Sequence, residues 1–369
     1  MRIDQSLADH SCHPLRRALA PGIYPYLSGS AHVDELRRVV KAYGGAVVPG
    51  LAGAKLARQV DTILVDPAVY QPGVKDVPDA LFGYDEWLER QRVANVPVVL
   101  TDTPRIRNGD RTALRTALAR WEMVDEPTIV VLPIEPWWLK DGLPCLVEDV
   151  QAAGRPVAVV LLHRYNGLDA AGAVAGLVEF ASAVNELPVV SLRSDVSAVG
   201  AVAHGGFAGF VGMSDGTRHG QMPRRSSPSG KQPDNPLPDQ SPNIFLPAFH
   251  DYVKASKLPA FARAGGRGIA QCDDDVCRGQ SLLRITRLAE LDLASSRAAA
   301  SGHNAASVEQ TARFVFGSEE PRDAWWELCR AGADMSASLI ENGITLPVSR
   351  WLRQWLELGS PSHNPAAVG

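Results

Sequence analysis

The segment PTIVVLPIEP, residues 127–136, and the segment RPVAVVLLHR, residues 155–164, decide the fold class. Each is a nearly unbroken run of apolar residues, rich in valine, isoleucine and leucine, with a charged residue close to its end. Runs of this kind are typical of strands that are buried on both faces. Such strands form parallel sheets covered by helices.

The same pattern recurs along the chain. Six further runs read as strands: 45–50, 61–67, 96–104, 187–195, 205–215 and 242–251. Segments with helical periodicity lie between them, as in 112–124 and 171–186. Strands that alternate with helices at roughly 30 residues per unit predict an α/β fold, a (β/α)8 TIM-like barrel. An open dinucleotide-binding sheet is disfavoured, because no G-x-G-x-x-G follows a strand.

Changes in composition divide the chain into four parts. We expect an N-terminal extension (1–44), the barrel with a Pro/Ser-rich insertion at 222–242 (45–268), a metal-binding subdomain (269–308) and a C-terminal helical segment (309–369). The insertion is compatible with a plain surface loop or with a lid that contacts a ligand. The tryptophans of the last part, Trp325, Trp326, Trp351 and Trp355, are expected to pack its helices onto the barrel.

The overall composition is that of a soluble globular protein. Of 369 residues, 45% are hydrophobic and 21% are charged, with a net charge of −4, so there is no global basic field of the kind that attracts nucleic acid. The five cysteines are an odd number, which favours a reducing compartment over a disulfide framework. No apolar run is long enough for a membrane span or a signal core. We therefore expect a cytoplasmic protein with no membrane association.

Ionisable residues follow the predicted strands, where a barrel of this class places its chemistry. They are Asp66, Asp102, Glu135, His163, Arg164, Arg193, Asp195, Asp215 and His219. Each alone is compatible with an ordinary salt-bridged loop residue. Together they predict a polar mouth suited to an enzyme or a small-molecule binder.

A second candidate site lies near residue 270. Cys272 and Cys277 form a C-x4-C pair, and His303 lies further along the chain. Two thiolates and an imidazole are good zinc ligands, and a structural zinc site takes four. One of the aspartates between the cysteines, or a water molecule, would complete the site.

The spacing of these residues resembles the zinc motif C-x-C-x2-C-x25-H of the tRNA-guanine transglycosylase family. Cys272, Cys277 and His303 match the first cysteine, the third cysteine and the histidine, and Asp274 stands at the second cysteine. The resemblance implies a structural Zn2+ that pins an appended subdomain against a (β/α)8 barrel. It extends more faintly over residues 45–305.

Upstream, LTDTPR (100–105) resembles the family's LTDSGG segment, which places an essential aspartate on Asp102. The resemblance implies that Asp102 is a general base or positions the base, and that Glu135 holds the purine edge. The mouth residues Asp66, Tyr70, His163, Arg193 and Gly212 are the other candidate substrate-binding positions, with Tyr70 or Phe210 available for stacking.

The family's nucleophile, an aspartate after the eighth strand, has no match in register. In PNIFLPAFHDYV (242–253) its position falls on Asn243 or Leu246, neither of which can attack a ribose carbon. Asp239, His250 and Asp251 lie nearby, and with a shift in register Asp251 is our candidate.

Three hypotheses remain open. The first is an enzyme that exchanges a guanine in nucleic acid, tRNA or DNA, for a 7-deazaguanine base, as a homodimer or with a partner subunit. Phosphate contacts would come from the basic stretch 254–287, which is equally compatible with a solvated surface. The second is a non-catalytic zinc-bearing barrel that binds nucleic acid or a base in a larger complex. The third is an unrelated barrel enzyme that uses GMSDGTRHG (212–220), where backbone amides near Ser214 bind phosphate and His219 acts as acid or base.

Overall fold

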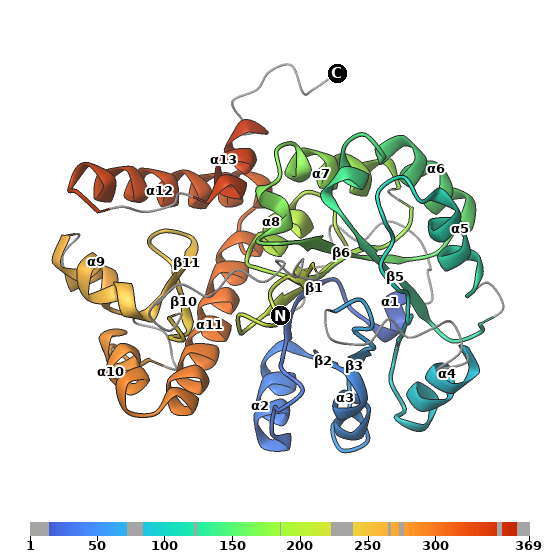
Figure 1. Cartoon of the computed structure of the whole chain (residues 1–369), viewed down its shortest axis with the longest axis horizontal. Helices are drawn as coiled ribbons and strands as arrows, with labels where there is room; N and C mark the ends of the chain where they lie inside the picture. Colours follow the sequence, from blue (N-terminus) through green and yellow to red (C-terminus); the bar gives the residue numbers. More distant parts are fainter. Residues whose placement is uncertain are drawn as a thin grey trace, which may run out of the picture.

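Eight parallel strands form the central barrel of the computed structural model (Figure 1). The structure describes residues 15–71, 84–121, 124–184, 186–222, 239–264, 267–272, 277–344 and 349–359. The barrel strands are β1 (Gly22–Tyr26), β2 (Ala46–Pro49), β3 (Ile63–Asp66), β4 (Val99–Leu100), β5 (Thr128–Ile134), β6 (Val157–His163), β7 (Val189–Ser194) and β8 (Ala208–Gly212). They follow one another around the ring in chain order, which confirms the predicted fold class.

The strand that pairs with both β2 and β8 comes from the segment expected to be an N-terminal extension. The sequence GIYPY of β1 was missed as a strand because it is short, starts with glycine and contains Pro25, all of which weaken the pattern of a central strand. The run 242–251, predicted as the eighth barrel strand, instead begins a hairpin outside the barrel. Its apolar residues correctly signal burial, but burial alone does not reveal the pairing partner.

Helices surround the barrel. They are α2 (Val33–Tyr43), α3 (Gly50–Ala57), α4 (Tyr84–Val93), α5 (Arg111–Ala119), η2 (Pro136–Leu139), α6 (Leu143–Ala153), η3 (Gly167–Asp169), α7 (Ala173–Ala183) and α8 (Ser197–Ala203). Neighbouring residues of β5 serve two cores: Val130 faces the helices and Val131 faces the lumen. The lumen is filled by side chains such as Tyr24 and Phe210, and the short helix α1 (Leu15–Ala18) adds Leu15 to this core. Burial on both faces explains the continuous apolar runs.

The contact between β3 and β4 differs from the contacts between the other neighbouring strands of the barrel. β3 and β4 lie side by side, but no ladder joins them in the described residues. Instead the side-chain amide of Gln91, from α4, accepts a hydrogen bond from the N–H of Leu100 at 3.1 Å and donates to its carbonyl at 3.0 Å. The indole of Trp87 donates to the same carbonyl at 2.9 Å. A side-chain amide thus satisfies the backbone groups that a strand would otherwise pair.

Residues 243–316 form an appended unit beside the barrel (Figure 1). Its elements are β10 (Asn243–Leu246), β11 (Asp251–Lys254), η4 (Ala255–Lys257), α9 (Leu258–Ala264), η5 (Arg267–Ala270), α10 (Leu283–Leu291) and α11 (Leu293–Phe316). β10 and β11 pair as an antiparallel hairpin. The long helix α11 contacts β10 on one side and β1 and α8 of the barrel on the other, so it is the boundary between the two parts.

Two C-terminal helices, α12 (Pro321–Glu341) and α13 (Arg350–Glu357), complete the fold. As expected, tryptophans anchor them: Trp325 stacks on Trp351 with ring centroids 6.3 Å apart, and Trp355 lies 5.0 Å from the ring of His204 at the end of α8. All three indoles are almost fully buried. Most of the Pro/Ser-rich insertion, residues 223–238, lies outside the described residues.

Candidate functional site

Cys272, Cys277 and His303 meet in the appended unit. Their ligand atoms all lie within 4.8 Å of one another, and all three residues are buried. The Nδ1 atom of His303 is 3.4 Å from each sulfur. Three donors that converge in this way suit a single metal ion, as the sequence predicted. Asp274, the expected fourth ligand, lies outside the described residues.

The neighbours of this cluster fix its chemistry. The Nε2 atom of His303 lies 2.8 Å from the carbonyl oxygen of Phe245, which can only accept, so Nε2 carries the proton and Nδ1 is left free to bind a metal. Arg284 donates to the sulfur of Cys277 at 3.3 Å, and a cation in this position favours the thiolate. A metal here would tie β10, the turn at 277–280 and α11 together.

Three of the predicted mouth residues meet at the centre of the barrel. The carboxylate of Asp66 accepts hydrogen bonds from the hydroxyls of Tyr26 at 2.7 Å and Tyr70 at 2.5 Å. Arg193 donates to the Tyr26 hydroxyl at 3.1 Å and lies over its ring. Burial and the nearby Asp66 raise the pKa of both tyrosines, so both remain hydrogen-bond donors. Tyr26 was not among the residues predicted from the sequence, because the short segment of β1 does not have the pattern of a central strand.

Residues 213–222, which we call the strap, lie across this mouth. A Cβ atom at Gly212 would fall 2.3 Å from the backbone of Thr217 and Arg218. The carbonyl of Gly216 accepts a hydrogen bond from Arg193. Further on, β9 (Gly220–Gln221) pairs with β6 and rests on Val160 and Leu162. The strap therefore occupies the space above Gly212 where the sequence predicted substrate.

Hydrogen bonds within the strap occupy backbone amides of the predicted phosphate site at 212–220. The N–H of Ser214 donates to the hydroxyl of Thr217, and the N–H of Thr217 donates to the carbonyl of Ser214. Both amides are therefore used within the turn. Burial, together with Arg218 and Arg193, lowers the pKa of His219 to about 3, so its imidazole is neutral at physiological pH.

Asp102, Glu135 and His163 do not join the Asp66 cluster. Asp102 pairs with Arg120 at 3.5 Å, and Glu135 pairs with Arg105 at 2.5 Å. Nδ1 of His163 accepts from the backbone N–H two residues on, at 3.2 Å. Burial raises the pKa of Asp102 to about 6, which the Arg120 charge only partly offsets.

Asp251, the candidate nucleophile, begins β11. Its carboxylate accepts from the hydroxyl of Ser349, just before α13, and from the N–H of Tyr252 at 2.7 Å. Burial, helped by the nearby carboxylates of Asp195 and Asp169, raises its pKa to about 7, and the hydrogen bonds from Ser349 and Tyr252 oppose this rise. Asp251 therefore acts as a buried link between the hairpin and α13.

A cleft of about 410 Å³ lies between the strap, the hairpin and α11. We call it the subdomain cleft. Its polar lining includes Ser214, Asp215, Asp239, Asn243, Lys254 and Arg297. The side chain of Asp215 is 44% exposed, so a ligand can reach it.

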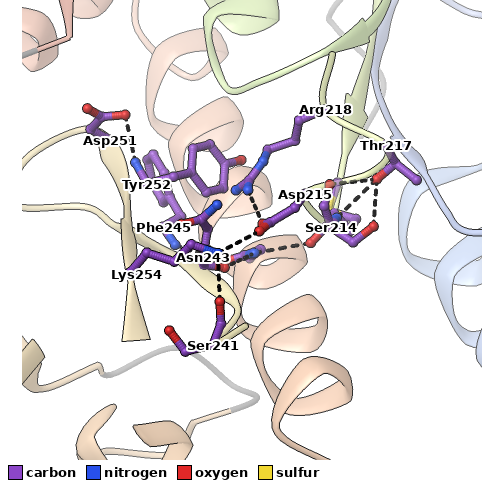
Figure 2. A network of polar contacts seen from close by, with 12 residues as sticks. Ser214, Asp215, Thr217, Arg218, Ser241, Asn243, Phe245, Asp251, Tyr252 and Lys254 are labelled. Carbon is purple, nitrogen blue, oxygen red and sulfur yellow. Dashed lines mark hydrogen bonds and ion pairs between the residues drawn. The ribbon is translucent and has the colours of Figure 1, made fainter. Parts of the chain in front are cut away.

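Figure 2 shows how Asp215 is held. One carboxylate oxygen pairs with Arg218, and the other lies 3.2 Å from Nζ of Lys254. The guanidinium of Arg218 lies 3.9 Å from the ring centroid of Tyr252, and Lys254 also donates to the carbonyl of Ser241 at 2.8 Å. The close-up places Asp251 at the opposite end of β11 from Lys254, away from Asp215.

The cleft combines residues that sequence reasoning considered separately. Asp215 was one of the predicted mouth residues, Lys254 belonged to the basic stretch, and Asn243 appeared only as a failed match to the nucleophile. Arg297 was missed altogether, because nothing in the sequence indicates that the second turn of α11 faces the end of β8.

No protein-family model matches the sequence, and no curated protein matches it at a significant level. Within the described residues, no helix combines the length and the apolar character needed to cross a bilayer.

Proposed function

We propose that the protein is a divergent transglycosylase-like enzyme that exchanges a guanine in tRNA or DNA for a 7-deazaguanine base, with the subdomain cleft as its active site. The observation that carries the proposal is the position of the cysteine–histidine cluster. It belongs to a unit packed beside the C-terminal ends of the barrel strands, and the cleft between that unit and the barrel contains an accessible carboxylate.

The metal in this proposal is zinc. In a tetrahedral site with Zn–S near 2.3 Å and Zn–N near 2.1 Å, sulfur and nitrogen lie about 3.6 Å apart. The two distances from His303 Nδ1 to sulfur are 3.4 Å. Thiolate and imidazole together are a donor set that zinc prefers. The ion would fix the hairpin and α11, which form two walls of the cleft, and would take no part in the chemistry.

Asp215 is our candidate nucleophile, in place of Asp251. In the resembled family this aspartate follows the eighth strand. In this chain the last barrel strand is β8, and Asp215 is the first acid after it. Lys254 and Arg218 bind its two oxygens and fix its orientation.

Exchange would proceed in two balanced steps. A carboxylate oxygen of Asp215 bonds to ribose C1′ as the C1′–N9 bond breaks, and the departing guanine takes up a proton. The incoming base then loses its N9 proton, bonds to C1′ and displaces Asp215.

The non-catalytic alternative has one observation in its favour. Asp66 and Tyr70, two of the predicted substrate-binding residues, are almost fully buried, so a base cannot reach them in this conformation. A barrel that only binds nucleic acid would not need that access.

Base exchange itself tests the proposal. The protein is incubated with tRNA or duplex DNA and a 7-deazaguanine base, and the nucleosides are analysed by mass spectrometry. We expect incorporation into one polymer, and a loss of at least about 100-fold in rate for Asp215→Asn. Asp34→Asn, at a side chain that is 91% exposed, is the control and should keep the wild-type rate.

Binding of a polymer without any exchange would favour the non-catalytic alternative. Neither binding nor exchange would reject both. Full exchange by Asp215→Asn would remove Asp215 from the mechanism.

A further inference from the structure

Helix α11 forms one wall of the subdomain cleft. This wall carries one cationic side chain beside small side chains. Arg297, Ala300 and Ser301 are three and four residues apart, so they share one face of the helix. The small side chains of Ala300 and Ser301 leave space beside Arg297, and Ala300 is itself buried. Arg297 is exposed to the cleft and to solvent.

The other charged groups on the cleft wall already have partners. Asp215 pairs with Arg218 and Lys254, and Lys254 also binds the carbonyl of Ser241. Asp239 accepts from the N–H of Ser241 at 2.9 Å and from the hydroxyl of Ser256 at 2.6 Å.

Arg297 differs from them. Within the described parts of the chain, no hydrogen bond or ion pair engages its guanidinium. The cleft therefore presents a cation that an incoming anion can pair with directly.

The remaining lining is polar and uncharged. Asn243 and Gln240 bring amide groups, and Ser214 and Ser301 bring hydroxyls. The volume of about 410 Å³ lies within the range of small-molecule sites, roughly 300–1,000 Å³. Amides match the edge of a base, hydroxyls match a ribose, and a planar guanidinium matches phosphate oxygens.

We propose that the subdomain cleft takes a single nucleotide unit and that Arg297 binds its phosphate, so that the site discriminates a nucleotide from a nucleoside. This inference rests on the proposed function in taking the cleft as the substrate site, and it adds the residue that recognises the phosphate. The same chemistry could come from a free nucleotide or from the backbone of a polymer.

Calorimetric titration with 5′-GMP and with guanosine tests the phosphate contact. We expect 5′-GMP to bind at least about tenfold more tightly than guanosine, as one charge-assisted contact provides. Arg297→Ala should remove that difference. Arg287→Ala is the matched control, since Arg287 is also exposed, lies in the same unit and does not line the cleft. It should leave the ratio unchanged.

A single-stranded oligonucleotide distinguishes the two sources. If the oligonucleotide binds in an Arg297-dependent way and 5′-GMP does not bind, the phosphate is that of a polymer. The proposal is overturned if the wild type binds 5′-GMP and guanosine with equal affinity and does not bind the oligonucleotide through Arg297. It is also overturned if the affinity ratio is unchanged in Arg297→Ala. No binding by any of the three probes also overturns it.

Asp215→Asn separates this inference from the proposed function. It should abolish base exchange while the ratio between 5′-GMP and guanosine affinities persists. A phosphate preference in a protein that shows no exchange would refute the proposed reaction and leave the phosphate site standing.

Discussion

The side-chain amide of Asn304 joins Met213 of the barrel to Asn243 of the hairpin. Its Nδ2 donates to both carbonyl oxygens at 3.1 Å, and its Oδ1 accepts from the N–H of Phe245 at 2.8 Å. Asn304 is almost fully buried and directly follows His303 on α11. One amide thus connects the end of β8, the hairpin and the helix that carries a metal ligand.

Asn304→Ala should lower the free energy of unfolding by about 3 kcal/mol or more, because it leaves two carbonyls and one N–H unsatisfied in a buried place. Urea unfolding measures the loss. Asn342→Ala is the control, since Asn342 makes one exposed contact to the carbonyl of Ser338 and its loss should cost little. Equal effects of the two substitutions would show that the Asn304 bridge does not hold the parts together.

One zinc ion per chain should be found by elemental analysis of the purified protein. Cys277→Ser should lose the metal and much of the stability it provides, which is roughly 10–16 kcal/mol for structural zinc in small zinc domains. Chelation of the wild type should lower the unfolding midpoint in the same direction. Cys145→Ser, at a cysteine outside the cluster, should retain both metal and stability. A metal-free wild type of full stability would contradict the assignment.

Gly212→Ala should displace the strap. The new methyl group would meet the backbone of Thr217 and Arg218 at 2.3 Å, and overpacking of this kind costs about 1–3 kcal/mol. Faster amide hydrogen exchange over 213–222, together with a lower unfolding midpoint, is the expected result. Gly216→Ala is the control within the strap, because nothing lies within 4 Å of a Cβ there. Unchanged exchange in Gly212→Ala would mean that the strap does not rest on this glycine.

Asp251→Asn should make stability less dependent on pH. Burial raises the pKa of Asp251 to about 7, so between about pH 4 and pH 7 the folded chain holds a proton that the unfolded chain has released. Stability contributed by this group is therefore complete below pH 4 and is lost as the pH rises to 7. The full loss amounts to as much as about 4 kcal/mol.

The amide has no charge to bury, so the variant should gain on the wild type at pH 8 and match it near pH 4. Unfolding midpoints at the two pH values measure the difference. Asp34→Asn, at an exposed carboxylate, should change neither. A variant that is less stable than the wild type at pH 8 would show that the charged form of Asp251 is the stabilising one.

Seven of the eight barrel strands were predictable, because burial on both faces gives each of them a continuous apolar run. β1 was not, since Gly22 and Pro25 interrupt its pattern and its neighbours in the sheet are fixed only by the closure of the ring. The hairpin strand at 243–246 has the same apolar pattern as a barrel strand. Only the tertiary structure shows that it packs on α11 instead.

The candidate sites were predictable to different degrees. Cys272, Cys277 and His303 meet as expected. Their spacing alone is a weak signal, and the expectation came from its resemblance to the zinc motif of a known family. Asp66, Tyr70 and Arg193 also lie close together. Tyr26 takes part in their hydrogen-bond network, but this could not be predicted because β1, which carries Tyr26, was not recognised as a strand. The choice of Asp251 depended on taking 242–251 as the eighth barrel strand, and the structure shows that this segment begins the hairpin instead.

The hydrogen bonds between Gln91 and Leu100 have a consequence for the way the ring closes beside β4. In a barrel whose neighbouring strands are all joined by backbone hydrogen-bond ladders, the number of strands and their stagger fix the circumference. At β4 the N–H and the carbonyl of Leu100 bond to side chains of α4 instead of to β3: Gln91 bonds to both groups, and Trp87 bonds to the carbonyl. Within the described residues, the spacing between β3 and β4 is therefore not fixed by a backbone ladder. The same contacts leave the backbone of Leu100 no free donor, and occupy its carbonyl twice, so this edge of β4 is closed to pairing with a further strand.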